Sequence, residues 1–222
     1  MPQLDWEKII PSNRREYYRE IYNDHKDITL LDELRYISIC AITEHCLKVK
    51  GAFAECGVYR GGSAIGITKI AQGETANRHV HLFDSFNGSN RFEMNPSDFS
   101  TLHTFNDYSF QDVAKRFPEN DYIHFHVGVI PETLKEVEDE KFSFVHLDLN
   151  FYESTSESLK FFHAHLSPRG VIVVDDYGFK LYENHVKRAV DEFSKENRID
   201  IFSIGTGQCL LGDSVLEVLG CS

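Results

Sequence analysis

Five short apolar runs divide the chain, and segments with turn residues or helical periodicity separate them. The runs are residues 52–56, 79–86, 122–128, 142–149 and 170–178. Strands separated by helix-length segments do not pair as hairpins, because crossover connections of a dozen or more residues join parallel neighbours. This pattern is typical of a parallel sheet with helices on both faces, so we predict an α/β protein.

Two predicted helices begin at recognisable capping patterns. Thr29 with Asp32, and Ser154 with Glu157, resemble capping boxes ahead of apolar residues at helical spacing. The helices are predicted at 29–50, 63–72, 109–117, 131–137, 154–166 and 183–196. After the last helix, two apolar runs flank the glycines of 205–207, which predicts a C-terminal β-hairpin with antiparallel strands.

Two segments fall outside this regular pattern. Residues 1–28 are polar and aromatic, and we predict an N-terminal appendage or lid there, with 29–222 forming one domain. Residues 87–108 are polar and rich in turn residues, and a loop of that length in a compact domain is usually functional. We therefore expect both segments to cover a ligand site and to select what enters it.

Charge and hydropathy exclude several classes of partner. The formal net charge of −12 argues against a nucleic-acid backbone or an anionic membrane as the main partner. The chain has no run of about 18 apolar residues that would predict a membrane span, and its N-terminus lacks a signal-peptide core. The five cysteines are scattered, and we expect buried, reduced thiols in a cytoplasmic protein. They are Cys40, Cys46, Cys56, Cys209 and Cys221.

Acidic residues stand at the ends of four predicted strands. Glu55 ends the first strand, Asp84 the second and Asp148 the fourth, and Asp175 and Asp176 end the fifth. In open parallel sheets, ligands bind at the carboxyl ends of strands, near the reversal of strand order. We therefore expect these carboxylates to form one site.

The first two acids indicate an organic cation that carries a ribose. Glu55 stands where a dinucleotide-binding turn would have glycine, so the glycine-rich turn 57–62 suits an ammonium group better than a pyrophosphate. Asp84 can accept hydrogen bonds from both ribose hydroxyls. S-adenosylmethionine fits this description. The plainer alternatives are an ordinary tight turn after Glu55 and a turn capped by Asp84.

The other three acids indicate a hard metal ion. Asp148, Asp175 and Asp176 are expected within a few ångströms of one another, where like charges raise one another's pKa unless a cation compensates. Carboxylates with open coordination positions suit Mg²⁺ or another divalent cation that keeps substrate oxygens in its shell. Alternatively, these acids only cap turns and accept hydrogen bonds from backbone amides.

Five motifs together resemble one known family. FAECGVYRGGS, LFDSF, LDLNFYEST, VVDDYG and KRAVDEF occur in the order and spacing of the macrocin O-methyltransferase (TylF-like) family, over about residues 30–215. The resemblance implies a Rossmann-like class I methyltransferase fold with a seven-stranded, mostly parallel sheet. It also implies S-adenosylmethionine as cofactor and Mg²⁺ as the metal.

Site residues follow from the resemblance position by position. The methionine site would include Glu55, Gly57, Tyr59, Arg60, Gly61, Gly62 and Ser63. The ribose and adenine sites would include Asp84, Ser85, Gly128 and Val129, and the metal ligands would be Asp148, Asp175 and Asp176. The metal would hold the hydroxyl oxygens of the acceptor and lower the pKa of one of them.

One position departs from the family pattern. Two residues after the first metal ligand the family commonly has an aspartate that is a proposed general base, and this chain has Asn150. An amide does not accept a proton at neutral pH. Either metal polarisation alone suffices, or another group serves as the base, or catalytic power is reduced, and Asn150 could instead orient the acceptor by hydrogen bonds. Replacement bases to consider are His103, His185, Glu153 and Tyr177. We take Asp148, Asn150 and His185 as the candidate catalytic residues.

These observations favour a Mg²⁺-dependent O-methyltransferase that acts on a small-molecule hydroxyl, on a sugar or glycosylated natural product. One alternative is a catechol-type aromatic acceptor, because vicinal hydroxyls on a sugar or an aromatic ring chelate Mg²⁺ alike. A second is an S-adenosylmethionine-binding protein without transferase activity, which Asn150 motivates. The acid at Glu55 disfavours a nicotinamide-dependent oxidoreductase. The family resemblance and the aromatic-rich N-terminus favour a homodimer.

Overall fold

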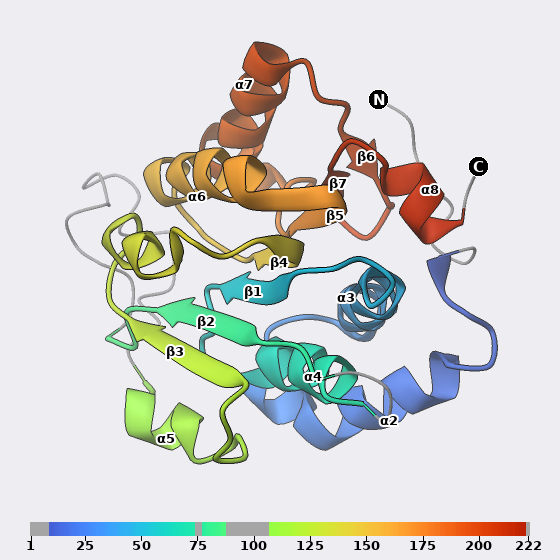
Figure 1. Cartoon of the computed structure of the whole chain (residues 1–222), viewed down its shortest axis with the longest axis vertical. Helices are drawn as coiled ribbons and strands as arrows, with labels where there is room; N and C mark the ends of the chain where they lie inside the picture. The colour runs from blue at the N-terminus through green and yellow to red at the C-terminus, as the bar shows by residue number, and fades with distance from the viewer. Residues whose placement is uncertain (1–8, 74–76, 88–106, 221–222) are drawn as a thin grey trace.

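A seven-stranded sheet forms the centre of the computed structural model, which describes residues 9–73, 77–87 and 107–220 (Figure 1). Its strand order is β3-β2-β1-β4-β5-β7-β6. The strands are β1 (Ala52–Cys56), β2 (Val80–Asp84), β3 (Ile123–Val127), β4 (Phe142–Leu147), β5 (Leu166–Val174), β6 (Phe202–Ser203) and β7 (Cys209–Leu211). The first five run parallel, while β7 is antiparallel to β5 and β6. The predicted α/β class, seven strands and C-terminal hairpin are confirmed.

Helices cover both faces of the sheet, as Figure 1 shows. They are α2 (Arg15–His25), α3 (Glu33–Cys46), α4 (Gly62–Ala71), α5 (Phe110–Ala114), α6 (Tyr152–His165), α7 (Arg188–Asn197) and α8 (Val215–Leu219), with short turns η1 (Lys26–Ile28), η2 (Glu132–Val137), η3 (Lys180–Tyr182) and η4 (Glu183–Lys187). One hydrophobic cluster joins α2, α3 and α4 to one face of the sheet, and a second joins η2, α6 and α7 to the other. Parallel strands buried on both faces explain the continuous apolar runs of the sequence.

The strand order reverses at the centre of the sheet, and this positions the site. From β1 the chain steps through β2 to β3 at one edge, then returns to β4 on the other side of β1. The crevice outside the carboxyl ends of β1 and β4 is therefore the expected place for a ligand.

Both predicted capping boxes are wrong in detail. Helix α3 is capped by Asp32, whose Oδ1 accepts from the amides of Leu34 at 2.9 Å and Arg35 at 3.1 Å, and the helix ends at Cys46. Helix α6 begins at Tyr152, ahead of Ser154, whose hydroxyl donates back to a backbone carbonyl of the preceding turn. In each case the direction from which the chain enters the helix decides which side chain reaches the free amides.

The segment before residue 29 shares the core of the domain. Tyr18 and Ile21 of α2 are buried in the same cluster as α3 and α4. The Tyr18 hydroxyl donates to Glu44 Oε2 at 2.7 Å, and Arg14 Nε donates to the same oxygen at 3.0 Å. These contacts fix α2 on α3, while the predicted role of residues 1–28 as an appendage or lid stays a prediction.

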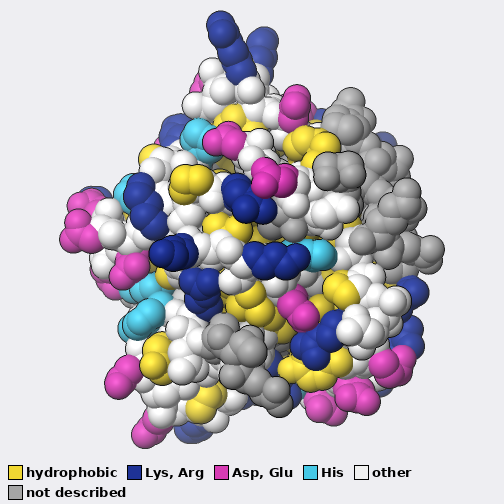
Figure 2. Space-filling model, turned by 45° about the vertical axis from the view of Figure 1, so that its right-hand side comes forward, with side chains coloured by type: hydrophobic (Ala, Val, Ile, Leu, Met, Phe, Trp, Pro, Cys, Tyr) yellow, Lys and Arg dark blue, Asp and Glu magenta, His cyan; other side chains and the backbone are white. Residues whose placement is uncertain are grey.

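Most of the predicted lid loop 87–108 lies outside the described residues, as does Cys221. The other four cysteines are buried and free, as predicted. Among the helices of the described residues, none has the length and apolar character to cross a membrane. Figure 2 shows Lys and Arg side chains gathered across the middle of one face, so positive charge is concentrated there despite the net charge of −12.

Candidate functional site

A cavity lies where the carboxyl ends of the parallel strands meet the segment that precedes α3. The predicted site residues in its wall are Gly57, Tyr59, Gly62, Ser63, Asp84, Ser85, Gly128, Val129, Asp148, Asn150 and Asp176. Residues 28–31, Arg35, Tyr108 and Tyr182 complete much of the remaining wall. The fold therefore brings most of the predicted cofactor residues and two of the predicted metal-binding acids into one cavity.

The other predicted site residues do not line this cavity: Glu55, Arg60, Gly61, Asp175 and His185. Glu55 and Asp175 are buried, with 0% and 1% of their surface exposed. Arg60 forms an ion pair with Asp107. His185 is half-buried in η4.

Gly57 makes the close approach of two strand ends possible. Its φ is +89°, and a Cβ at this position would lie 2.0 Å from the backbone oxygen of Asp148. The Gly57 amide donates to Phe83 O at 2.9 Å, and the Asp148 amide donates to Cys56 O at 2.9 Å. Glycine is required here because only a residue without Cβ fits both the dihedral angle and the contact.

Asp84 is held in place by donors from three directions. Its carboxylate accepts from the amides of Tyr59 at 2.8 Å and Phe86 at 2.7 Å, and from the Tyr108 hydroxyl at 3.1 Å. Burial raises the pKa of this carboxyl, and the hydrogen bonds oppose that rise. The Val58 backbone adds a further hydrogen bond to this carboxylate, so donors of the protein itself meet most of its acceptor positions.

The two acids that follow β5 share one arginine. Nη1 of Arg35, from α3, lies 3.2 Å from Asp175 Oδ1 and 3.2 Å from Asp176 Oδ1. The guanidinium also bonds Asp32 and the carbonyl oxygen of Leu30, and its side chain is only 13% exposed. One buried cation thus faces a group of carboxylates that outnumber it.

The electrostatics of this group reflect that imbalance. Burial, with the nearby charges of Asp175 and Asp176, raises the pKa of Asp148 well above its ordinary value. Burial, with the charge of Asp175, raises the pKa of Asp176 to about 7, while Arg35 acts in the opposite direction. The charged forms of Asp148 and Asp176 are therefore disfavoured unless a further cation compensates their charge.

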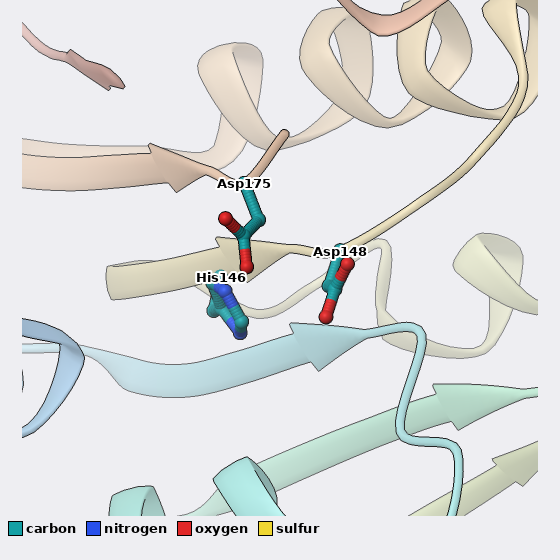
Figure 3. A group of neighbouring side chains, drawn as sticks. All are labelled: His146, Asp148 and Asp175. Carbon is teal, nitrogen blue, oxygen red and sulfur yellow. The ribbon is translucent and has the colours of Figure 1, made fainter. Parts of the chain in front are cut away.

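His146 is a further member of this group. Its ring is fully buried, and its Nδ1 lies 2.8 Å from Glu55 Oε1. One ring nitrogen of His146 and one oxygen each of Asp148 and Asp175 lie within 4.8 Å of one another, which is a spacing that can hold a metal ion. Figure 3 shows these three side chains gathered at the ends of β4 and β5.

Sequence reasoning missed Arg35, Tyr108, Tyr182 and His146. Arg35 is 140 residues from Asp175 along the chain, and it stands near the start of a helix whose middle is apolar, so it reads as a surface charge. Tyr182 hydrogen-bonds Asp176 from η3. The alternation of His146 with Asp148 along one strand was the available signal, but the other strand histidines obscured it.

The predicted replacements for the missing aspartate are scattered. Asn150 lines the cavity, whereas His185, Tyr177 and Glu153 are not among the described residues of its wall. The Tyr177 hydroxyl donates to a carboxylate of α7 at 2.7 Å. His103 lies outside the described residues.

Comparisons with known proteins show which family and relatives this chain resembles. Residues 29–205 match the sequence profile of the macrocin O-methyltransferase (TylF) family. A 159-residue stretch is 31% identical to 8-demethyl-8-(2,3-dimethoxy-alpha-L-rhamnosyl)-tetracenomycin-C 4'-O-methyltransferase of Streptomyces olivaceus, covering 66% of this chain and 59% of that protein. The match therefore spans about three fifths of that relative's length.

Two further likenesses cover more of the chain. Demethyldecarbamoylnovobiocin O-methyltransferase of Streptomyces niveus is 27% identical over 203 residues, 82% of this chain and 76% of that protein. The solved structure of the O-methyltransferase NovP has a TM-score of 0.70 at 24% identity, covering 83% of this chain and 81% of that one. The structural likeness shows that the two chains share a fold.

Proposed function

Because the chain belongs to the macrocin O-methyltransferase (TylF) family of S-adenosylmethionine-dependent O-methyltransferases, we propose that it methylates a hydroxyl group of a sugar. The sugar is part of a glycosylated natural product, since one relative is described as acting on a rhamnosyl-tetracenomycin and the other on a novobiocin precursor. One observation carries the proposal: the glycine turn, Asp84 and the acids Asp148 and Asp176 line the same cavity.

The cofactor end of the cavity would be the part near β1, β2 and β3. The turn from Gly57 to Ser63 would receive the methionine portion, while Asp84 and Ser85 would accept the ribose hydroxyls. Gly128 and Val129 would lie along the adenine. In support, Asp84 lines the cavity and is held in one orientation by hydrogen bonds from Tyr59, Phe86 and Tyr108.

The acceptor end would be the part near β4 and β5. The donor set there fits a divalent cation, because Arg35 neutralises only part of the charge of Asp148, Asp175 and Asp176. A bound Mg²⁺ or similar ion would polarise the acceptor hydroxyl and lower its pKa. The chain's own residues would hold the acceptor in line with the methyl group and exclude water.

Asn150 would orient the acceptor without taking its proton. Its amide can donate to one acceptor oxygen and accept from a neighbouring hydroxyl, and it lines the cavity beside Asp148. Positioning of this kind supplies much of the acceleration in reactions that need a collinear approach of nucleophile, carbon and leaving group.

The experiment has two stages. Calorimetric titration with S-adenosylhomocysteine tests the cofactor, and binding in the micromolar range is expected. Purified protein is then incubated with S-adenosylmethionine, divalent cation and a panel of rhamnosides and catechols, and methylated products are measured by mass spectrometry. Methylation of glycosides alone supports the proposal. Methylation of catechols alone would replace the acceptor class, and cofactor binding without any product would favour a binding protein.

A further inference from the structure

Four histidines stand together on the two strands at one edge of the sheet. β3 is the edge strand and β2 is its neighbour (Figure 1). His81 is paired in register with His124, while His79 precedes His81 by two residues and His126 follows His124 by two. Residues two apart on a strand share a face, so all four imidazoles lie on one face of the sheet. We call these four residues the histidine column.

The column consists of two hydrogen-bonded pairs of rings. Nδ1 of His79 lies 2.7 Å from Nε2 of His124, and Nδ1 of His81 lies 3.0 Å from Nε2 of His126. The two rings of each pair are nearly parallel, with interplanar angles of 15° and 20°. The pairs also contact each other, because the rings of His81 and His124 stack with their centroids 4.7 Å apart.

This geometry limits how many protons the column can carry. An N–H···N hydrogen bond needs one nitrogen with a proton and one with a lone pair, whereas a charged imidazole has a proton on both nitrogens. If both rings of a pair were charged, two N–H groups would point at each other. Each pair therefore holds at most one positive charge, and charges on both pairs would repel across the stacked rings of His81 and His124.

The surroundings of His81 favour its neutral form. Its side chain is buried, and within the described part of the chain its Nε2 has no hydrogen-bond partner. Burial, followed by the other three rings of the column, lowers the pKa of His81 to about 3. The rings of Phe83, Phe142 and Tyr122 also pack on the column, and none of them brings a charge at neutral pH.

Three carboxylates act on the column from the segments that flank β3. Oε2 of Glu136, in η2, lies 2.7 Å from Nδ1 of His126. Burial and the neighbouring rings lower the pKa of His124, against the opposing charges of Glu140 and Asp121. These carboxylates can support one charge on each pair, but they do not remove the limit that the N–H···N bonds set.

The column lies beside the cofactor end of the cavity. Asp84 ends β2 three residues after His81, and Gly128 follows β3 two residues after His126. The Gly128 amide donates to the carbonyl oxygen of Asp84 at 3.0 Å, so the pairing of the two strands continues into the cavity wall. Loss of pairing between β2 and β3 would therefore displace two residues that line the cavity.

We propose that the histidine column is a pH switch, which holds the edge strand β3 on β2 while its rings are mostly neutral and releases the strand as they gain protons. Release would also weaken cofactor binding, and this second step rests on the proposed function. A histidine whose folded pKa lies below its unfolded value stabilises the fold above about pH 6.5, and this contribution is lost as the pH falls below that value. For His81 alone, the unfolding constant should be about 30-fold larger at about pH 5 than at about pH 7.5.

Hydrogen exchange and thermal unfolding test the switch without any ligand. Both are measured on the full chain at about pH 7.5 and about pH 5, on either side of the ordinary histidine pKa. Amide exchange of residues 122–128, corrected for its intrinsic pH dependence, should be about 10-fold faster at the lower pH. His81→Asn keeps a donor near the position of Nδ1 but does not titrate, so acid should destabilise it less than the parent protein. His124→Gln, altered in the other pair, carries the same expectation.

His163→Gln is the matched control, because His163 is a half-buried imidazole of α6 that packs on Phe193, outside the column. It should be destabilised by acid as much as the parent protein is. Calorimetry with S-adenosylhomocysteine at both pH values then tests the link to the cofactor. Acid should weaken binding about 5-fold more in the parent protein than in His81→Asn. Only this difference is diagnostic, because both proteins contain the Asp84 carboxyl, whose pKa is raised by burial.

The outcomes separate this inference from the proposed function. Equal acid destabilisation of the parent protein and of the folded column variants, or exchange of residues 122–128 that acid does not accelerate, overturns the switch. Equal pH dependence of S-adenosylhomocysteine binding in the parent protein and His81→Asn overturns its link to the cofactor. A protein that binds no S-adenosylhomocysteine and methylates no acceptor refutes the proposed function, while exchange and unfolding still decide on the switch. Accelerated exchange, with reduced acid sensitivity in the column variants and not in His163→Gln, supports the inference.

Discussion

The two ends of the cavity are stabilised in opposite ways. At the β2 end, Asp84 is bonded by Tyr59, Phe86 and Tyr108, so its charge is met by donors fixed to nearby elements. At the β4–β5 end, Asp148, Asp175 and Asp176 have one arginine nearby, and the pKa values of Asp148 and Asp176 are raised. At the first end, hydrogen bonds from the protein compensate the charge of Asp84. At the second end, the carboxylates carry more negative charge than Arg35 compensates, so a bound cation would stabilise them. Binding of the cofactor and activation of the acceptor should therefore be separable by mutation.

The largest expected effect is at the acceptor end. Asp148→Asn removes a carboxylate that would hold the cation, and turnover should fall about 1,000-fold, because Lewis-acid stabilisation contributes several kcal/mol. The affinity for S-adenosylhomocysteine should stay within about twofold. Initial rates and calorimetry on the same preparation check both values. Undiminished turnover in this variant, or in excess chelator, would remove the metal from the mechanism.

The reciprocal variant at the cofactor end is Asp84→Asn. Replacing the charged acceptor should weaken S-adenosylhomocysteine binding about 10–100-fold, because hydrogen bonds to charged groups contribute about 1.5–3 kcal/mol. The affinity for the divalent cation should not change, since Arg35 and the cation-binding acids are untouched. Calorimetry with each ligand measures both. Equal losses of both affinities would show that the two ends are coupled and that the comparison fails.

Arg35 allows a test through stability. Arg35→Gln leaves Asp175 and Asp176 buried without their cation, and removing one partner of a buried ion pair costs about 3–5 kcal/mol. Thermal unfolding should therefore occur at a lower temperature. Divalent cation should restore more stability to this variant than to the parent protein, because it would compensate the same acids. Arg19→Gln is a suitable control, since Arg19 pairs with Glu16 and Glu33 at the surface.

The sequence predicted the residues that line the β2 end of the cavity better than those at the β4–β5 end, for a physical reason. The glycine turn and Asp84 are local features: Gly57 needs its positive φ and close contact, and Asp84 stands at the end of an apolar run. Arg35 and His146 act through neighbours 140 and 91 residues away. Their roles depend on the crossing of α3 over the sheet and on strand register, which no local pattern encodes.

The same reasoning explains which details of the fold were predicted. The strands β1 and β4 match predicted runs to within two residues, because buried parallel strands are continuous apolar stretches. The sequence alone did not fix the start of α3, because the side chains of both Thr29 and Asp32 offer an oxygen that can cap its first turn. The path of the chain into the helix selects Asp32, and Thr29 instead accepts from the Leu31 amide at 3.2 Å.

The smallest expected effect is at Asn150, where the sequence has an amide in place of the aspartate expected from the family resemblance. Asn150→Asp restores a carboxylate in the cavity wall, so the turnover rate should be preserved or should rise up to about 10-fold at neutral pH, as expected for a weak added base. An additional negative charge beside Asp148 would also attract the cation, so rates must be compared at saturating metal. If the rate instead falls severely while cofactor and metal affinities hold, the amide itself orients the acceptor. In that case, at the acceptor end, the hydrogen bonds of the neutral Asn150 amide position the sugar, and the cation alone activates its hydroxyl oxygen. The difference between the two ends of the cavity would then extend to how each binds its ligand.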